Sequence, residues 1–264
     1  MGVTHEPFPA TRHSVIAQAR DPNDAVRSRA YGMLVAAYWK PVYKYVRIRW
    51  RAEPEDAEDL TQAFFAHACE KNFFSRYDPS RARFRTYLRT CLDGFVANEL
   101  KAAARLKRGG HARFVPLDIA GAVRGSDFAR AEVELRAHDE ALLLASGDDP
   151  AADVEQYFHR EWVRALFAQA LAGLRALCER TGRRHYYAVF ERYDLVDDPE
   201  RRPTYAALAA ELALTPTQVT NYLAFARREF RRLVLERLHA MTGSDEEFRA
   251  EARELLGVDP RDVT

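Results

Sequence analysis

The chain has 264 residues, of which 47% are hydrophobic and 30% charged, with a formal net charge of +1. This composition excludes an intrinsically disordered chain, and no apolar run approaches the roughly 18 residues of a membrane-spanning helix. The length suits two small helical domains. Because Cys69, Cys91 and Cys178 are widely spaced and the N-terminus lacks a secretory pattern, we expect a cytoplasmic protein without a disulfide framework.

The small net charge conceals two oppositely charged blocks. Residues 71–113 contain eleven Lys or Arg and three Asp or Glu, a local balance of +8. Residues 114–161 contain four Arg and eleven Asp or Glu, a local balance of −7. Such segregation indicates one part of the molecule that meets a polyanion and one part that must not.

Helical periodicity without alternating apolar strands predicts an all-α fold of two small helical domains joined by an acidic linker. The expected parts are an N-terminal arm with a short helix at most (1–23), a first helical domain (24–108), the linker (109–152), a second helical domain (153–242) and an acidic tail (243–264). The tail carries Asp245, Glu246, Glu247, Glu251 and Glu254. One hypothesis is that this tail folds back on the basic surface.

Three helices are expected in the first domain. The first runs from about Asp24 to Trp50 with a kink at Pro41, and the second begins at Pro54, a favoured first helical position. Its predicted buried stripe is Leu60, Phe64 and Cys69 with Ala57 and Ala68. The third helix, from Phe84 to about Arg108, should bury Phe84, Leu88, Cys91, Leu92, Phe95, Val96, Leu100 and Ala103.

The third helix lies in the segment RARFRTYLRTCLDGFVANELKAAARLKRGG, which mixes arginines with aromatic residues. Arginine neutralises phosphate and an exposed aromatic face stacks on an unpaired base, so this helix could hold a melted strand. Tyr87 is the aromatic residue expected to be exposed. The alternative is a solvated basic face over an ordinary aromatic core.

The second domain begins with a long helix whose predicted buried stripe is Phe158, Trp162, Leu166, Ala170, Leu174 and Leu177 or Cys178. A shorter helix is expected around Tyr186–Tyr193. Residues 204–238 then predict a helix-turn-helix: a short helix from Thr204 to Leu212, a turn at Ala213-Leu214, and a longer helix that Thr215 and Gln218 begin with a capping box. Ala213 replaces the usual glycine, at a cost on the order of 1 kcal/mol.

The second helix of such a motif enters the major groove, where its first residues read base edges. The residues at that end are Thr217, Gln218, Thr220 and Asn221, and Arg227 and Arg228 lie further along, placed for phosphates. An ordinary helical hairpin with a basic outer face is the alternative.

Three segments resemble one family in the family's own order. PEDAEDLTQAFFAHACEK resembles region 2 of bacterial RNA polymerase sigma factors, YDPSRARFRTYLRTCLDGFVANEL resembles the promoter-melting helix that follows, and TYAALAAELALTPTQVTNYLAFARREFRRL is similar to region 4. The region between them resembles neither additional domain of housekeeping sigma factors, so the resemblance is to the two-domain, extracytoplasmic-function type.

The resemblance implies three sets of site residues. Those that would bind the clamp of the largest subunit of core RNA polymerase are Asp56, Asp59, Leu60, Gln62 and Phe65. Those along the downstream promoter element, where DNA is melted, are Arg85, Tyr87, Arg89, Asn98, Lys101, Arg105 and Arg108. Those at the upstream element, on duplex DNA, are Thr217, Gln218, Thr220, Asn221, Arg227 and Arg228.

For Asp56 and Asp59 the plainer reading is that they only complement the helix dipole. The resemblance also implies that the linker threads an RNA-lined channel of the enzyme, whereas the residues alone allow a solvated linker. An inhibitory anti-sigma partner remains an open possibility.

The sequence lacks the common motifs of catalytic sites. It contains no glycine-rich phosphate loop and no GxSxG, and His67 with Cys69 lacks the second pair that a zinc site needs. We therefore expect no enzyme activity, no cofactor and no metal. Two other functions stay open: a helix-turn-helix regulator that acts without polymerase, and a helical scaffold protein.

Overall fold

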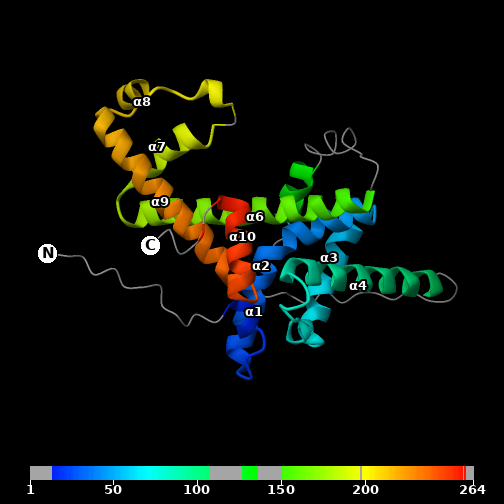
Figure 1. The fold of residues 1–264 in the computed structure, drawn as a ribbon. Coiled ribbons are helices and arrows are strands. Elements are labelled where there is room, and N and C mark those ends of the chain that lie inside the picture. The colour runs from blue at the N-terminus through cyan, green and yellow to red at the C-terminus, as the bar shows by residue number, and fades with distance from the viewer. Residues whose placement is uncertain (1–13, 107–126, 136–149, 197, 258, 260–264) are drawn as a thin grey trace. The chain divides into compact units, whose positions relative to one another are not determined.

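The computed structural model describes residues 14–106, 127–135, 150–196, 198–257 and 259, and within these residues it contains helices and no strand (Figure 1). The predicted all-α fold class is confirmed. The chain divides into two compact units, Met1–Ala165 with His239–Thr264 and Leu166–Leu238, which we call the first and the second unit. No described helix is long and apolar enough to cross a membrane.

The first unit contains α1 (Val15–Gln18), α2 (Asp24–Arg49), α3 (Pro54–Glu70), the 3₁₀ helix η1 (Phe73–Arg76), α4 (Phe84–Leu106), the first part of α6 (Pro150–Arg180) and α10 (Asp245–Leu256). Aromatic rings fill its core. The ring of Phe84 lies 5.6 Å from those of Tyr38 and Phe74, and all three side chains are buried. This packing fixes the start of α4 against α2 and η1.

Part of the predicted linker is a packed helix. Residues 127–135 are helical, and the ring of Phe128 lies 5.0 Å from Trp39 and 5.2 Å from Tyr43 of α2. Two carboxylates of this helix pair with α2, Glu132 with Arg47 at 2.7 Å and Glu134 with Lys40 at 2.6 Å. Burial alone would raise the pKa of Glu134, but hydrogen bonds from Lys40 and Lys44 lower it below its usual value.

The second unit contains the rest of α6, α7 (Arg184–Asp194), the 3₁₀ helix η2 (Pro199–Arg201), α8 (Tyr205–Glu211) and α9 (Pro216–Ala240) up to Leu238. The stripe predicted for α6 is buried, with Cys178 rather than Leu177 at its end. Val189 of α7 and Leu208 of α8 pack with Val219 and Leu223 of α9 in one apolar cluster. This cluster fixes the angle at which α9 leaves the turn.

Two predicted stripes are partly wrong. Cys69 is exposed, and on α4 Leu100 has 46% of its surface exposed while Ala103 is exposed too. Burial along α4 ends at Val96, so the apolar period continues beyond the core that it was expected to mark. α2 is helical on both sides of Pro41.

Candidate nucleic-acid and polymerase interface

The start of α3 presents an acidic surface. Pro54 occupies the first helical position, and Asp56 and Asp59 are exposed, whereas Ala57 on the opposite side is fully buried. Burial and then the neighbouring Asp59 raise the pKa of Glu58 above its usual value. These carboxylates suit the positive end of the helix dipole and are also free to meet a basic partner.

Three further residues of α3 were predicted to contact the polymerase. Leu60 and Gln62 are half-buried, and the Gln62 amide donates a hydrogen bond to Glu58 Oε1 at 3.1 Å. Phe65 is 3% exposed and its ring lies 5.2 Å from Phe64, so it belongs to the core. In this structure Phe65 offers a partner no surface, because apolar periodicity places it on the inner face.

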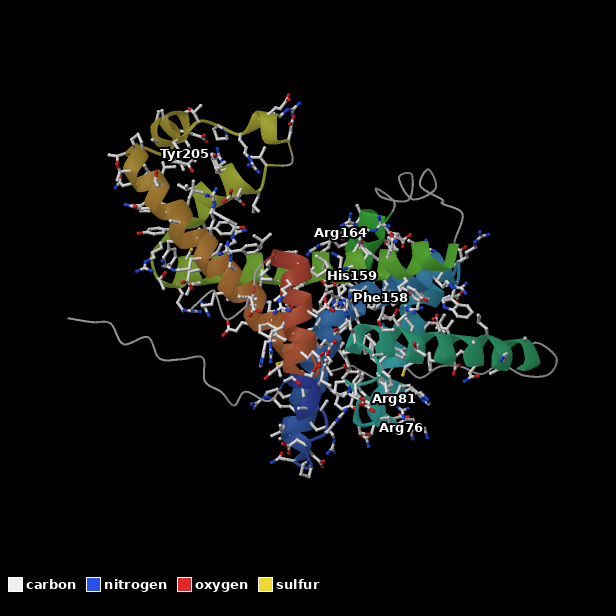
Figure 2. The ribbon with its side chains drawn as sticks, in the orientation of Figure 1. Arg76, Arg81, Phe158, His159, Arg164 and Tyr205 are labelled. Atoms are coloured by element: carbon white, nitrogen blue, oxygen red, sulfur yellow. The ribbon has the colours of Figure 1, made fainter. Side chains whose placement is uncertain are left out.

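The start of α4 lies between arginines. Arg83 and Arg85 flank the buried Phe84, and Arg76 and Arg81 project from the segment before the helix (Figure 2). Arg76 and Arg81 are exposed, whereas the side chain of Arg85 is only 13% exposed. The Arg85 guanidinium lies 5.2 Å from the centre of the Trp162 ring, a cation–π arrangement.

α10 covers two of these arginines, Arg83 and Arg85, with its carboxylates. Glu251, 1% exposed, pairs with Arg85 and lies 3.0 Å from Arg83 Nη1. Glu254 also pairs with Arg83, at 2.8 Å. The acidic tail thus folds back on the start of α4, as one hypothesis from the sequence supposed.

Glu247 of α10 caps α4 across a long sequence separation. Its Oε1 accepts a hydrogen bond from the Phe84 backbone N–H at 2.8 Å. Its Oε2 accepts from the Tyr77 hydroxyl at 3.0 Å and from the Gly243 N–H at 2.7 Å. Burial, followed by the Glu247 charge, raises the pKa of Tyr77. A carboxylate therefore occupies the N-terminus of α4, where the helix dipole favours an anion.

The same contact changes the acidity of two neighbours. The hydrogen bond from Arg83 holds the pKa of Glu254 below its usual range. Burial, reinforced by the Arg85 charge, lowers the pKa of His159, whose Nε2 lies 3.4 Å from Glu254.

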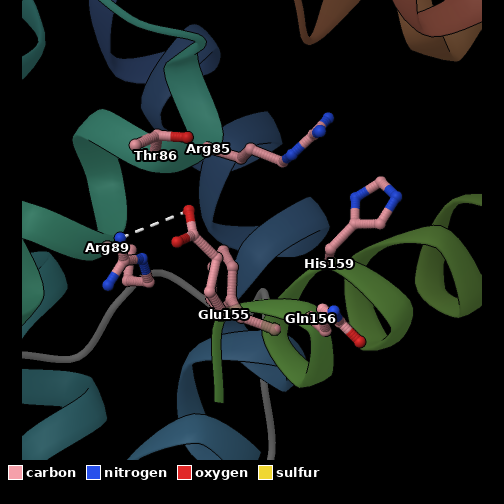
Figure 3. Close-up of a pocket in the computed structure, with 7 residues that line it drawn as sticks. Arg85, Thr86, Arg89, Glu155, Gln156 and His159 are labelled. Carbon is pink, nitrogen blue, oxygen red and sulfur yellow. Dashed lines mark ion pairs between the residues drawn. The ribbon is translucent and has the colours of Figure 1, made fainter. Parts of the chain in front are cut away.

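A pocket of about 200 Å³ opens beside this contact, between α4 and the first part of α6 (Figure 3). Arg89 and Glu155 face each other across it at 3.3 Å. The other lining residues are Arg85, Thr86, Gln156, Phe158 and His159. Arg89, predicted to lie along DNA, is therefore engaged by a carboxylate of its own chain.

Tyr87 is half-buried, not exposed as expected. Its hydroxyl donates to the Phe73 carbonyl at 2.8 Å, and burial, followed by its hydrogen bond with Cys91, raises the pKa of Tyr87 to about 12. The hydrogen bond draws the ring against η1. Further along α4, Asn98 and Lys101 are exposed, whereas Arg108 and the side chain of Arg105 lie outside the described residues.

The start of α9 has the local geometry predicted for it. Thr215 Oγ1 accepts from the Gln218 N–H at 3.2 Å, and Gln218 Oε1 accepts from the Thr215 N–H at 2.8 Å, a reciprocal capping box. Ala213 in the turn before it has a φ of 53°, the left-handed conformation expected there. The four residues predicted to read bases, Thr217, Gln218, Thr220 and Asn221, are all exposed.

The two arginines predicted to meet upstream phosphates differ in their contacts. Arg227 forms two hydrogen bonds with Asp194, at 2.7 and 2.8 Å, which raise its pKa. Arg228 lies 5.5 Å from the Phe225 ring and is exposed. Arg228 is thus the more available to an external phosphate.

The sequence reasoning missed the receiving side of the α10 contact. Tyr77, Arg83 and the Phe84 N–H took no part in the prediction, although Arg83 lies in the same RARFR run as Arg85. The spacing of Glu247, Glu251 and Glu254, which places them on one helical face, was the available signal. Among the described residues, no group of three or more His, Cys, Asp or Glu is arranged to hold a metal ion.

Residues 34–106 match the family model of sigma-70 region 2. The matched segment runs from α2 through the acidic start of α3 to the end of α4. It supports a factor of the sigma-70 family, with a role in transcription initiation by RNA polymerase. Comparisons with curated proteins and with solved structures gave no significant match.

Proposed function

We propose that this chain is a sigma factor of the extracytoplasmic-function type, which binds core RNA polymerase and directs promoter recognition, strand opening and initiation. The observation that carries the proposal is the region 2 match over residues 34–106, which contains both the exposed acidic start of α3 and the arginine-flanked α4. A DNA-binding regulator that acts alone has no use for the first of these surfaces.

The acidic surface of α3 is the proposed polymerase contact. Asp56 and Asp59 are exposed on adjacent turns, and Leu60 and Gln62 are half-buried beside them. Complementary charge orients two proteins and speeds their association, while burial of the apolar Leu60 side chain would add affinity. Phe65 supports this surface from the core rather than joining it.

The proposed DNA contacts lie on two helices. On α4, the exposed Asn98 and Lys101 would lie along the downstream element, with the arginines at the start of the helix holding phosphates of a melted strand. On α9, the exposed Thr217, Thr220 and Asn221 would meet base edges of the upstream element in the major groove.

The test is reconstitution of purified full-length chain with core RNA polymerase. We expect one complex in gel filtration and run-off transcripts from a subset of a genomic promoter library, with no transcripts from core enzyme alone. A chain that binds promoter fragments but never associates with polymerase would instead be the helix-turn-helix regulator considered above. Association without promoter-dependent transcripts would also overturn the proposal.

A further inference from the structure

The contact between α10 and the start of α4 places carboxylates where a nucleic-acid phosphate would bind. We propose that α10 is an internal competitor of the DNA strand: its acidic face occupies the arginine surface of α4, and a phosphodiester backbone must displace it to bind there. This inference rests on the proposed function, because it concerns the same downstream surface.

The receiving surface has the chemistry of an anion site. It offers the backbone N–H of Phe84 at a helix N-terminus, the Tyr77 hydroxyl, and the guanidinium groups of Arg83 and Arg85. Helix N-termini and guanidinium groups are the donors that proteins use for phosphate oxygens. In this structure carboxylate oxygens of Glu247 and Glu251 fill the positions that phosphate oxygens would take.

Ion pairs form a large part of this contact, beside the half-buried apolar side chains of Phe248, Leu255 and Leu256. The buried residues of α10 are Glu251 and Ala252, whereas the helix carries five acidic residues and two arginines. Attraction within the partly exposed Arg83–Glu254 pair weakens with salt, and each pair with an arginine is lost when another anion takes that arginine. An apolar face of the same length would not be exchanged in this way.

The segment that leads into α10 lies close against Tyr77, and this close approach limits where the helix can dock. Gly243 lies so close to the Tyr77 ring that a Cβ at this position would collide with it. Ser244 then caps α10, accepting a hydrogen bond from the Glu247 N–H at 3.1 Å. The approach of the chain at Gly243 therefore sets the position from which Glu247 reaches α4.

The binding-competent state is then the fraction of molecules in which α10 is undocked, and the apparent dissociation constant for DNA rises as that fraction falls. Weakening the docking should tighten DNA binding, which is opposite to the effect of damaging a DNA-binding surface. Removing negative charge from any protein also favours DNA, so the test needs a variant with the same charge change outside the contact.

The experiment measures binding of a fluorescein-labelled single-stranded DNA oligonucleotide to the full-length chain by fluorescence anisotropy. Two variants loosen the contact while keeping all arginines: Glu251→Gln with Glu254→Gln, and the charge-neutral Gly243→Ala. We expect the double variant to bind about tenfold more tightly, and Gly243→Ala to change in the same direction. The control for the double variant is Asp245→Asn with Glu246→Gln, which removes the same two charges at exposed positions of the same helix and should change affinity less than about twofold.

Hydrogen exchange provides the second readout. Backbone amides of residues 245–256 should exchange faster when the wild-type chain is saturated with the oligonucleotide, because DNA displaces the helix. If they stay protected with DNA bound, α10 is a permanent part of the fold and the proposal is wrong. Unchanged or weaker binding by both loosened variants, or binding by none of the chains, would also overturn it.

If the double variant does not fold, Glu254→Gln alone serves, because this side chain is 44% exposed and its loss leaves the core intact. A gain of about threefold is then expected, against less than about twofold for the single-charge control Glu246→Gln. Association with core polymerase is measured on the same preparations and reports on the proposed function separately. Chains that bind polymerase but show no competition reject only the α10 proposal, and chains that show competition but never bind polymerase reject the sigma-factor proposal.

Discussion

The two acidic helices of the first unit use their carboxylates in opposite ways. Both begin with acidic residues in the first turn, but on α3 Asp56 and Asp59 are exposed, whereas on α10 Glu251 is buried against arginine. The difference lies in the partner rather than in the acidic motif. α10 meets arginines of its own chain, and α3 presents its charges outward, which suits a second protein.

Charge reversal at Asp56 and Asp59 should have the largest effect. In the double variant Asp56→Lys with Asp59→Lys, association with core polymerase should weaken by at least about 100-fold, since like charges brought together across an interface cost several kcal/mol. The measurement is co-purification with core enzyme. Thermal unfolding should change little, because both side chains are exposed.

The matched control reverses two charges on α10, with Asp245→Lys and Glu246→Lys, also at exposed positions. This variant should co-purify with polymerase as the wild type does. If the α3 variant co-purifies equally well, its acidic start serves only the helix dipole and the comparison between the two helices fails.

Glu251, the carboxylate buried against Arg85, should contribute to the stability of the fold rather than to polymerase binding. Glu251→Ala leaves Arg85 largely buried without its partner, and removal of one member of a buried ion pair costs about 3 kcal/mol or more. Denaturant unfolding should show this loss. Glu246→Ala, on the same helix but exposed, should stay within about 0.5 kcal/mol of wild type. Equal stability of the two variants would show that α10 is not docked in solution.

Local signals predicted most of the helices, and long-range contacts account for what was missed. Pro54 and the Thr215–Gln218 capping box lie where two helices begin, because a cap acts within one turn. The contact of Glu247 with Phe84 joins residues 163 positions apart, and periodicity within either helix cannot encode it. Phe65, which the family resemblance implied as a polymerase contact, packs beside Phe64 on the inner face of α3 instead.

On α9 of the second unit, base reading and helix capping depend on different residues, so their effects can be measured separately. Asn221 is exposed on α9, so Asn221→Ala should change promoter preference by about 1–3 kcal/mol, the cost of a bidentate contact with adenine, at unchanged stability. Gln218 caps α9, so Gln218→Ala should lower stability by about 1 kcal/mol. Selection from a promoter library and denaturant unfolding measure the two effects. Promoter selection indifferent to Asn221→Ala would mean that α9 does not read bases.

The smallest expected effect is a pH dependence of α10 docking. The hydrogen bond from Arg83 lowers the pKa of Glu254, and Arg85 and His159 also face this carboxylate. A carboxylate whose pKa is lowered in the folded state stabilises docking at pH values above its ordinary pKa of 4.5. That stabilisation is lost as the pH falls through the lowered pKa. Hydrogen-exchange protection of residues 245–256 should therefore fall in acid in the wild type, and the difference from Glu254→Gln should vanish at the lowest pH. A difference that persists there would show that Glu254 acts through its shape rather than its charge.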